Sequence, residues 1–276
     1  MLKDVTLGQF FPGKSPLHTL DPRVKILCAC VFIVSVFLCH SVLSYAALLL
    51  TTLALILLSR ISVKVILKGL KPIVFIAAFT AVINLFWVTG KTPLVSWKFI
   101  TIYPEGIWNA VFMLIRIVTL VLGSTLLLTY TTSPMALTDA LERLLKPLKK
   151  LHVPVHEFAM MMTIALRFVP TLVTETDKII SAQKARGADF ESGNLLNRAK
   201  ALIPVLIPLF VSAFRRADEL AIAMECRCYR GGEGRTRMKI LHATKKDFFL
   251  FSLFVLAAVG FFFLNDLTAT LGMYVS

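Results

Sequence analysis

The feature that most restricts the fold of this chain is a series of apolar runs, each close to the length that crosses a lipid bilayer. They cover about residues 24–39, 42–58, 72–88, 107–130 and 248–264 and contain almost no charge. A helix rises about 1.5 Å per residue, so about 20 apolar residues span the hydrocarbon core of a bilayer. We therefore predict an all-α membrane protein with about five transmembrane helices.

Composition points to the same class of protein. Of the 276 residues, 57% are hydrophobic and 17% are charged, whereas soluble domains are about 25% charged. These values exclude a disordered chain and disfavour a soluble enzyme. The first apolar run follows some twenty polar residues and has no small-residue cleavage site behind it, so we expect it to remain rather than be cleaved as a signal peptide. Three of the five cysteines lie in that run, which does not fit a secreted disulfide framework.

The basic residues predict the orientation. The net charge is +14, and in a membrane protein such an excess marks cytoplasmic loops rather than nucleic-acid binding. Of the 30 Lys and Arg residues, 27 fall before or at the start of the first run, between the second and third, or within residues 131–247. We therefore expect a cytoplasmic N-terminus and an external C-terminus. The expected segments are 1–130 with an N-terminal arm and four spans, 131–247 in the cytoplasm, and 248–276 with the fifth span and a tail.

Two polar side chains, Asn84 and Arg116, fall inside predicted spans. A charge at the centre of a membrane helix costs at least ~2.5 to 3.5 kcal/mol on insertion scales, so it should face the bundle interior and have a partner. One interpretation is a substrate path. The other is a lock in which Arg116 binds Asn84 or a backbone carbonyl. We favour the lock, because one charge and one amide make a poor pathway.

Residues 131–247 predict three helices outside the spans. A short amphipathic helix begins at Ser133-Pro134, where serine can cap the helix and proline fits its first turn. Two longer helices follow, over about 155–187 with a kink at Pro170 and over about 195–232. Each has about 30 residues and is therefore roughly 45 to 50 Å long.

The two long helices are apolar on most sides. The residues that produce this pattern are Met160, Met161, Ile164, Leu166, Leu206, Leu209 and Phe210. A helix that is hydrophobic all round is buried, so these residues either bury one another and the ends of the spans or form a docking platform for another membrane protein. Methionines would let such a platform repack against more than one partner.

Each long helix also ends in an arginine between small residues, in Ala185-Arg186-Gly187 and in Cys226-Arg227-Cys228. Small neighbours leave a guanidinium free to make forked bonds to carboxylates or carbonyls. A cation at a helix C-terminus is also favoured by the helix dipole. Spacing alone leaves both a binding role and plain C-terminal capping open.

Two further patterns match known ligand motifs but lack their context. Residues 8–15, GQFFPGKS, satisfy the phosphate-loop spacing, but that loop needs a strand before it and a helix after it, and we expect no helix before residue 24. Cys226-x-Cys228 lacks a second ligand pair, and Pro154 interrupts His152-x-x-x-His156. We expect neither nucleotide nor zinc to bind here.

Four segments together resemble a known family over nearly the whole chain. They read GQFFPGKSPLHTLDPRVK, TTSPMALTDALERLLKPLKKLHVPVHEFAMMMTIALRFVPTL, KIISAQKARGADF and LFVSAFRRADELAIAMECRCYRGG. They resemble the transmembrane T component of energy-coupling factor (ECF) transporters. The resemblance implies a multi-pass protein of a prokaryotic plasma membrane that joins two cytoplasmic ABC-type ATPases to a substrate-binding S component. Such assemblies import vitamins or metal ions, with ATP and Mg²⁺ on the ATPases and no cofactor in this chain.

The resemblance also implies a role for the two arginines. In the family, the arginines of two Ala-Arg-Gly motifs at the ends of coupling helices enter grooves on the ATPases. Ala185, Arg186 and Gly187 match the first motif, and Arg227 matches the arginine of the second. Cys226 and Cys228 replace the usual alanine and glycine, so we expect the end of that helix to shift to Gly231.

Two other functions fit the sequence less well. A conventional ABC importer permease would carry a cytoplasmic Glu-Ala-Ala type loop, which is not visible. A membrane-embedded enzyme would need grouped acidic, His or Ser side chains inside the spans, where Asn84 and Arg116 are essentially the polar residues. The transported substrate is not encoded here, because the resemblance assigns its selection to the S component.

Overall fold

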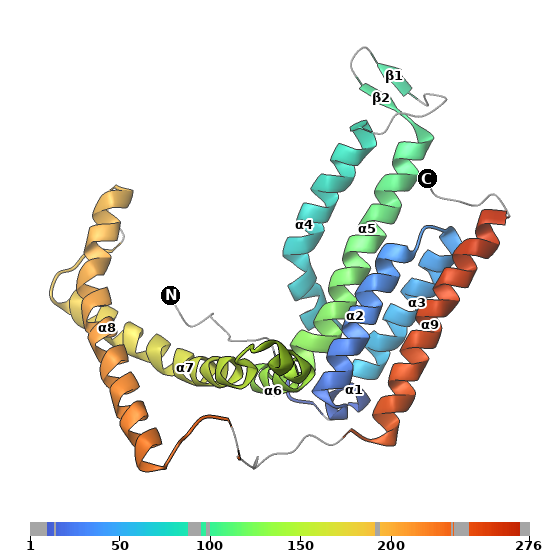
Figure 1. The fold of residues 1–276 in the computed structure, drawn as a ribbon. Coiled ribbons are helices and arrows are strands. Elements are labelled where there is room, and N and C mark those ends of the chain that lie inside the picture. Colours follow the sequence, from blue (N-terminus) through green and yellow to red (C-terminus); the bar gives the residue numbers. More distant parts are fainter. Residues whose placement is uncertain are drawn as a thin grey trace. The chain divides into compact units, whose positions relative to one another are not determined.

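The computed structural model describes residues 10–13, 15–87, 95–97, 100–190, 194–232, 234 and 243–270. The described chain is almost entirely helical, as predicted (Figure 1). It forms two compact units. We call Gly8–Leu137 with Ile240–Ser276 the membrane unit and Thr138–Lys239 the inserted unit, because the second interrupts the first along the chain.

The membrane unit contains all five predicted spans. Its elements are α1 (Pro16–Thr19), α2 (Pro22–Leu38), α3 (Val42–Ser59), α4 (Val63–Trp87), the antiparallel strands β1 (Val95–Trp97) and β2 (Ile100–Ile102), α5 (Pro104–Ser124), the π-helix η1 (Thr125–Tyr130) and α9 (Lys245–Thr270). Asp21 caps the start of α2 by accepting a hydrogen bond from the backbone N–H of Arg23 at 2.9 Å, and proline occupies the first turn, a typical helix start.

Several boundaries differ from those expected. Helix α4 begins at Val63 rather than at Pro72, because the lysines before the apolar run lie exposed on the same helix and Pro72 does not end it. Helix α9 continues to Thr270, six residues past the predicted end at Leu264. The expectation of no helix before residue 24 is wrong, since α1 and the start of α2 precede it.

Helix length and composition give a different count from the five spans expected. Among the described residues, six helical segments are long and apolar enough to cross a membrane, and they lie in α3, α4, α5 with η1, α7, α8 and α9. Helix α2 is not one of them, since it has 17 residues. By length and composition, α7 and α8 of the inserted unit are therefore candidate spans as well.

The core of the membrane unit lies where α2 packs against α5 and α9, while α4 packs along α5. Gly123 in α5 makes the α2–α5 approach possible. A Cβ atom at this position would lie 2.0 Å from Cε1 of Phe32, a buried residue of α2. No real Cβ contact is that short, so a side chain here would force the two helices apart.

The inserted unit contains α7 (Val155–Ala185) and α8 (Leu195–Cys226), preceded by α6 (Pro134–Leu144), which begins in the membrane unit, and by the 3₁₀ helix η2 (Lys146–Leu151). Helices α7 and α8 pack against each other. Where they meet, Arg216 donates to a carboxylate oxygen of Glu175 at 2.9 Å. At the start of α7, His156 pairs with Glu142 at 2.8 Å.

Candidate functional site

The two candidate arginines occupy equivalent positions in the structure. Arg186 is the C-cap of α7 and Arg227 is the C-cap of α8, with φ and ψ of −87° and 6° for the first and −92° and 14° for the second. The next residue is left-handed in both cases, with φ of +86° at Gly187 and +55° at Cys228. The two helices therefore end with nearly the same backbone conformation.

The hydrogen bonds at the two ends also correspond. At the end of α7, Gly187 N–H donates to the Lys184 carbonyl at 3.0 Å, and Ala188 N–H donates to the Gln183 carbonyl at 3.0 Å. This pair of bonds is the helix stop that usually places glycine in the left-handed position.

At the end of α8, Cys228 N–H donates to the Glu225 carbonyl at 2.8 Å, and Tyr229 N–H donates to the Met224 carbonyl at 3.0 Å. The expected shift of this helix end to Gly231 is therefore wrong, since α8 ends at Cys226. Cys228 adopts the left-handed conformation itself. That conformation costs an L-residue about 1–2 kcal/mol, and the two backbone bonds offset it.

Both guanidinium groups are available for binding. Arg186 and Arg227 are exposed, and neither guanidinium has a hydrogen-bond or ion-pair partner among the described residues. Backbone bonds alone form the two caps, so neither side chain is needed to end its helix. Arg216, in the middle of α8, is by contrast tied to Glu175.

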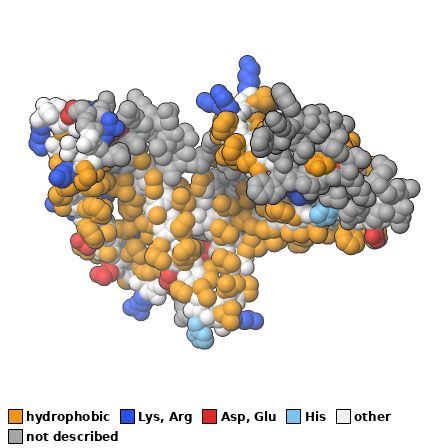
Figure 2. Space-filling view, turned by 90° about the horizontal axis from the view of Figure 1, so that it is seen from above, with side chains coloured by type: hydrophobic (Ala, Val, Ile, Leu, Met, Phe, Trp, Pro, Cys, Tyr) orange, Lys and Arg blue, Asp and Glu red, His pale blue; other side chains and the backbone are white. Residues whose placement is uncertain are grey.

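The seven predicted platform residues are not fully buried. Met161, Leu206 and Phe210 are 58%, 45% and 60% exposed, and Met160, Ile164, Leu166 and Leu209 are half-buried. Other exposed apolar side chains of α7 and α8 accompany them, namely Phe158, Met162, Ile207, Val211 and Phe214. Figure 2 shows hydrophobic side chains over much of the described surface seen from above. No described part of the chain covers Met161, Leu206 or Phe210.

The two intramembrane polar residues do not meet each other. Arg116 Nε donates to the Tyr45 hydroxyl at 2.8 Å, and Arg116 Nη2 donates to the Cys39 carbonyl at 3.2 Å. Asn84 Nδ2 instead donates to the Thr80 carbonyl on its own helix at 3.0 Å and to Met113 Sδ of α5 at 2.9 Å. Arg116 therefore ties α5 to the turn between α2 and α3. Tyr45, its side-chain partner, was not identified from the sequence.

Asn265 forms a second polar centre that the sequence did not indicate. Its Oδ1 accepts hydrogen bonds from the backbone N–H groups of His40 and Ser41 at 3.1 and 3.2 Å and from the Ser44 hydroxyl at 2.8 Å. Its Nδ2 donates to the Leu38 carbonyl. One amide in α9 thus satisfies the end of α2 and the start of α3. The signal for it was an asparagine one residue past the last apolar run.

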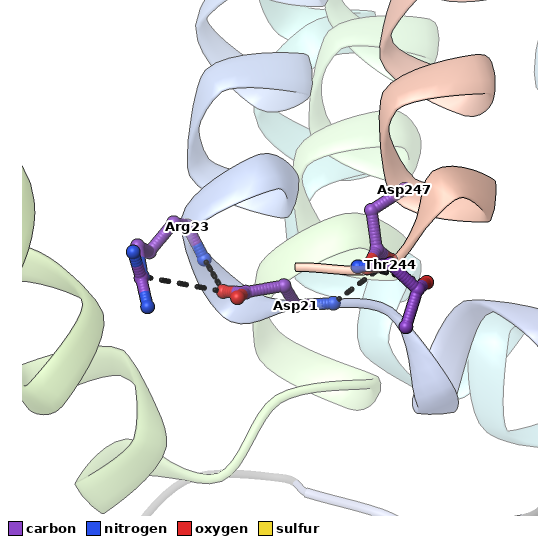
Figure 3. Close-up of polar contacts among 4 residues, drawn as sticks. All are labelled: Asp21, Arg23, Thr244 and Asp247. Carbon is purple, nitrogen blue, oxygen red and sulfur yellow. Dashed lines mark hydrogen bonds and ion pairs between the residues drawn. The ribbon is translucent and has the colours of Figure 1, made fainter. Parts of the chain in front are cut away.

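A third polar centre lies at the start of α2 and α9 (Figure 3). Asp247 Oδ2 accepts from both the backbone N–H and the hydroxyl of Thr244, at 2.6 and 2.8 Å. Asp247 Oδ1 accepts from the backbone N–H of Asp21 at 3.2 Å. Asp247 therefore caps its own helix and holds the start of α2 beside it. Sequence reasoning counted the neighbouring Lys25 only as a basic loop residue.

Comparisons with known proteins place the chain in a family. The family model for the cobalt transport protein, CbiQ, matches residues 13–240. The chain is 57% identical over 249 residues to the energy-coupling factor transporter transmembrane protein EcfT of Clostridium kluyveri, covering 90% of this chain and 92% of that one. The corresponding protein of Bacillus subtilis is 48% identical over 264 residues, covering 95% and 99%. The chain belongs to the cobalt transport protein family.

Within this family, the chain is a transmembrane component of an ECF transporter, as its resemblance predicted. Its apolar helices make it a multi-pass membrane protein. Membership of a transporter family fits a non-catalytic subunit. No group of three or more possible metal ligands occurs in the part of the chain that the structure describes. Cys226 and Cys228, on either side of Arg227, are exposed free thiols.

Proposed function

We propose that this chain is the coupling subunit of an ECF importer. It joins two ABC-type ATPases to a substrate-binding S component, and the assembly takes up a vitamin or a metal ion. ATP and Mg²⁺ bind to the ATPases, and this chain transmits their movement without hydrolysing ATP. The observation that carries the proposal is that α7 and α8 end in the same cap, each presenting an exposed arginine without a partner among the described residues.

Two equivalent helix ends suit two similar partners. A guanidinium offers a rigid planar fork of N–H donors that matches carboxylates and carbonyls. The cap gives each arginine a defined direction, because the residue after it is held in a left-handed turn by two backbone bonds. A groove on an ATPase that accepts one such end would accept the other.

Replacing the arginines tests this role. Arg186→Glu and Arg227→Glu should leave the chain in the membrane but release the ATPases during copurification. Losing one partner of a buried charged contact costs about 2 to 5 kcal/mol, roughly 30-fold to several thousand-fold in affinity. Arg198→Glu, an exposed arginine near the start of α8, is the matched control and should retain both ATPases. Retention of ATPases by both helix-end variants would refute the proposal.

The exposed apolar residues of α7 and α8 are the proposed platform for the S component. Met161 lies 25 residues before Arg186 on the same helix, about 37 Å away at 1.5 Å per residue, so the two binding functions should be separable. Met161→Asp and Leu209→Asp should lose the S component and keep the ATPases. Leu196→Asp, an exposed leucine outside the platform, should keep both. If Met161→Asp and Leu209→Asp both retain the S component, it docks elsewhere.

The proposal also includes the orientation of the chain in the membrane. The distribution of basic residues favours a cytoplasmic N-terminus, an external C-terminus and α7 and α8 on the cytoplasmic side of a prokaryotic plasma membrane. Helices α7 and α8 are long enough to span, but both carry several charged side chains along their lengths. A single cysteine at position 96 should react with an impermeant thiol reagent in intact cells, and one at position 181 should not. Labelling at position 181 would reverse the assignment.

A further inference from the structure

The first turns of α2 contact both places where the chain passes between the two units. The chain enters the inserted unit after Leu137, which we call the outgoing passage, and returns to the membrane unit at Ile240, which we call the returning passage. Residues 131–132 lie just before the first passage, and residues 244–247 lie just after the second. Both sets of residues are bonded to the segment Asp21–Lys25 of the membrane unit.

Lys25 makes the first of these connections. Its ammonium donates to the Thr131 carbonyl at 2.8 Å and to the Thr132 hydroxyl at 3.2 Å. Lys25 is 2% exposed, and a buried ammonium is tolerated only when its hydrogen bonds and its charge are satisfied. The residues just before Thr131 form the π-helix η1, which ends at Tyr130. Lys25 therefore holds the chain where the regular α-helix of the fourth span has already ended.

Asp247 makes the second connection. It accepts from the backbone N–H of Asp21 and caps α9 through Thr244, as Figure 3 shows. Asp21 and Asp247 are 6% and 2% exposed, and both carboxylates attract the Lys25 ammonium electrostatically. The start of α2 thus bonds the outgoing passage through the Lys25 ammonium and the returning passage through the Asp21 backbone N–H.

We propose that Lys25 is a positioning residue for energy coupling. Lys25 bonds the outgoing passage to the same turn of α2 that holds the returning passage through the Asp21 backbone, and this clamp makes both move as one body when the ATPases act on the inserted unit. This inference rests on the proposed function, because it assumes that ATP-driven movement enters through α7 and α8. The two passages are the covalent paths by which such movement reaches the membrane unit, and without the clamp each would move independently.

Filling space alone would not require a charged side chain at position 25. A buried ion cluster can often be replaced by apolar side chains of similar volume without loss of stability. A methionine in place of Lys25 would fill the same volume but could not bond Thr131 and Thr132 to the start of α2. The clamp and simple core packing therefore make different predictions for the same substitution.

The test measures whether the two passages stay together. Nitroxide labels at positions 135 and 248, in a cysteine-free chain copurified with its ATPases, report the distance between them by double electron–electron resonance. In the unsubstituted chain we expect one narrow distribution that ATP with vanadate does not change. Lys25→Met should assemble with the ATPases yet show a broadened distribution that shifts on addition of ATP and vanadate.

Lys25→Met with Asp247→Asn removes both charges, so neither is left buried without its partner, and it should show the same broadening if the single variant fails to assemble. Lys68→Met, an exposed lysine of α4, is the matched control and should remain narrow. A narrow, unchanged distribution in both Lys25 variants overturns the proposal. So does failure of both to assemble while Lys68→Met assembles, since Lys25 would then serve folding alone. If the unsubstituted chain binds no ATPases, the proposed function fails, while the nucleotide-free distribution still tests the clamp.

Discussion

The buried polar side chains of the membrane unit differ from the two helix-end arginines of the inserted unit in whether they have partners. In the membrane unit, Lys25, Arg116 and Asn265 each bind partners from other elements of the same unit. In the inserted unit, Arg186 and Arg227 extend from helix ends with no partner among the described residues. Polar groups in a bilayer must be satisfied internally, whereas those at a helix end in water can be left for another protein. The difference separates side chains that hold the fold from side chains that bind.

Exposed apolar side chains differ between the units as well. Phe75 in α4 and Leu50 in α3 are 78% and 69% exposed, as expected of residues that face lipid. Phe210 and Met161 are similarly exposed, but their helices also carry charged residues such as Arg167 and Arg215. Contact with lipid explains the exposure of Phe75 and Leu50. The second pair lies on helices that the charge pattern predicts to be outside the bilayer, where a large exposed apolar patch generally marks an interaction site.

We expect the largest loss of stability from substitution of Asn265, because the buried polar groups of the membrane unit depend on hydrogen bonds within that unit. Asn265→Leu removes the amide that bonds the Leu38 carbonyl, the Ser41 N–H and the Ser44 hydroxyl. Each unsatisfied buried group costs about 1–3 kcal/mol, so we expect a loss of about 3 kcal/mol or more in unfolding free energy, measured by SDS titration in mixed micelles.

Two controls sharpen this prediction. Asn84→Leu makes the same change at an amide whose acceptors are the Thr80 carbonyl of its own helix and the weakly accepting Met113 Sδ of α5, and it should cost less than about 1 kcal/mol. Arg227→Ala removes an exposed arginine from the inserted unit and should change stability by no more than about 0.5 kcal/mol. Equal losses at positions 265 and 227 would contradict the contrast between the units.

A smaller loss is expected from overpacking at Gly123. Gly123→Leu forces a side chain into the Phe32 ring and should cost about 2–3 kcal/mol. Gly260→Leu in α9 is the matched control, because a Cβ atom there meets nothing within 4 Å. Thermal unfolding in detergent should show a lower midpoint for the first variant and little change for the second. Equal midpoints would mean that α2 and α5 can separate without cost.

The fold was largely predictable because it follows from apolar run length. Errors arose where helices extend beyond those runs. Helix α4 includes exposed lysines that made residues 63–71 look like a loop, and α9 includes Asn265 one residue past its predicted end. Long lysine stems can lie along a helix while their charged ends reach water. Charged residues therefore do not mark the end of a helix.

The polar centres could not be predicted, because they join residues far apart in sequence. Asp21 and Asp247 are 226 residues apart, and no local pattern indicates that α2 and α9 begin side by side. The arginine ends were predictable as positions, since each follows a long periodic helix. Their conformation was not. The expectation that a left-handed residue must be glycine moved the end of α8 to Gly231, whereas Cys228 adopts that conformation.

The left-handed conformation of Cys228 leads to the smallest and most local prediction, which concerns whether the two helix ends are stabilised in the same way. Cys228→Gly should relieve about 1 kcal/mol of left-handed strain and strengthen the cap, whereas Gly187→Cys should introduce the same strain at the end of α7. Space does not limit either change, since a Cβ atom at Gly187 meets nothing within 4 Å. About 1 kcal/mol corresponds to roughly fivefold in an opening equilibrium, so amide hydrogen exchange should slow about fivefold at Tyr229 in the first variant and accelerate about fivefold at Ala188 in the second. Copurification of the ATPases should persist in both, because the backbone path that directs each arginine is retained. Unchanged exchange at both amides would mean that the two ends, although alike in hydrogen bonding, do not depend on the left-handed residue for their stability.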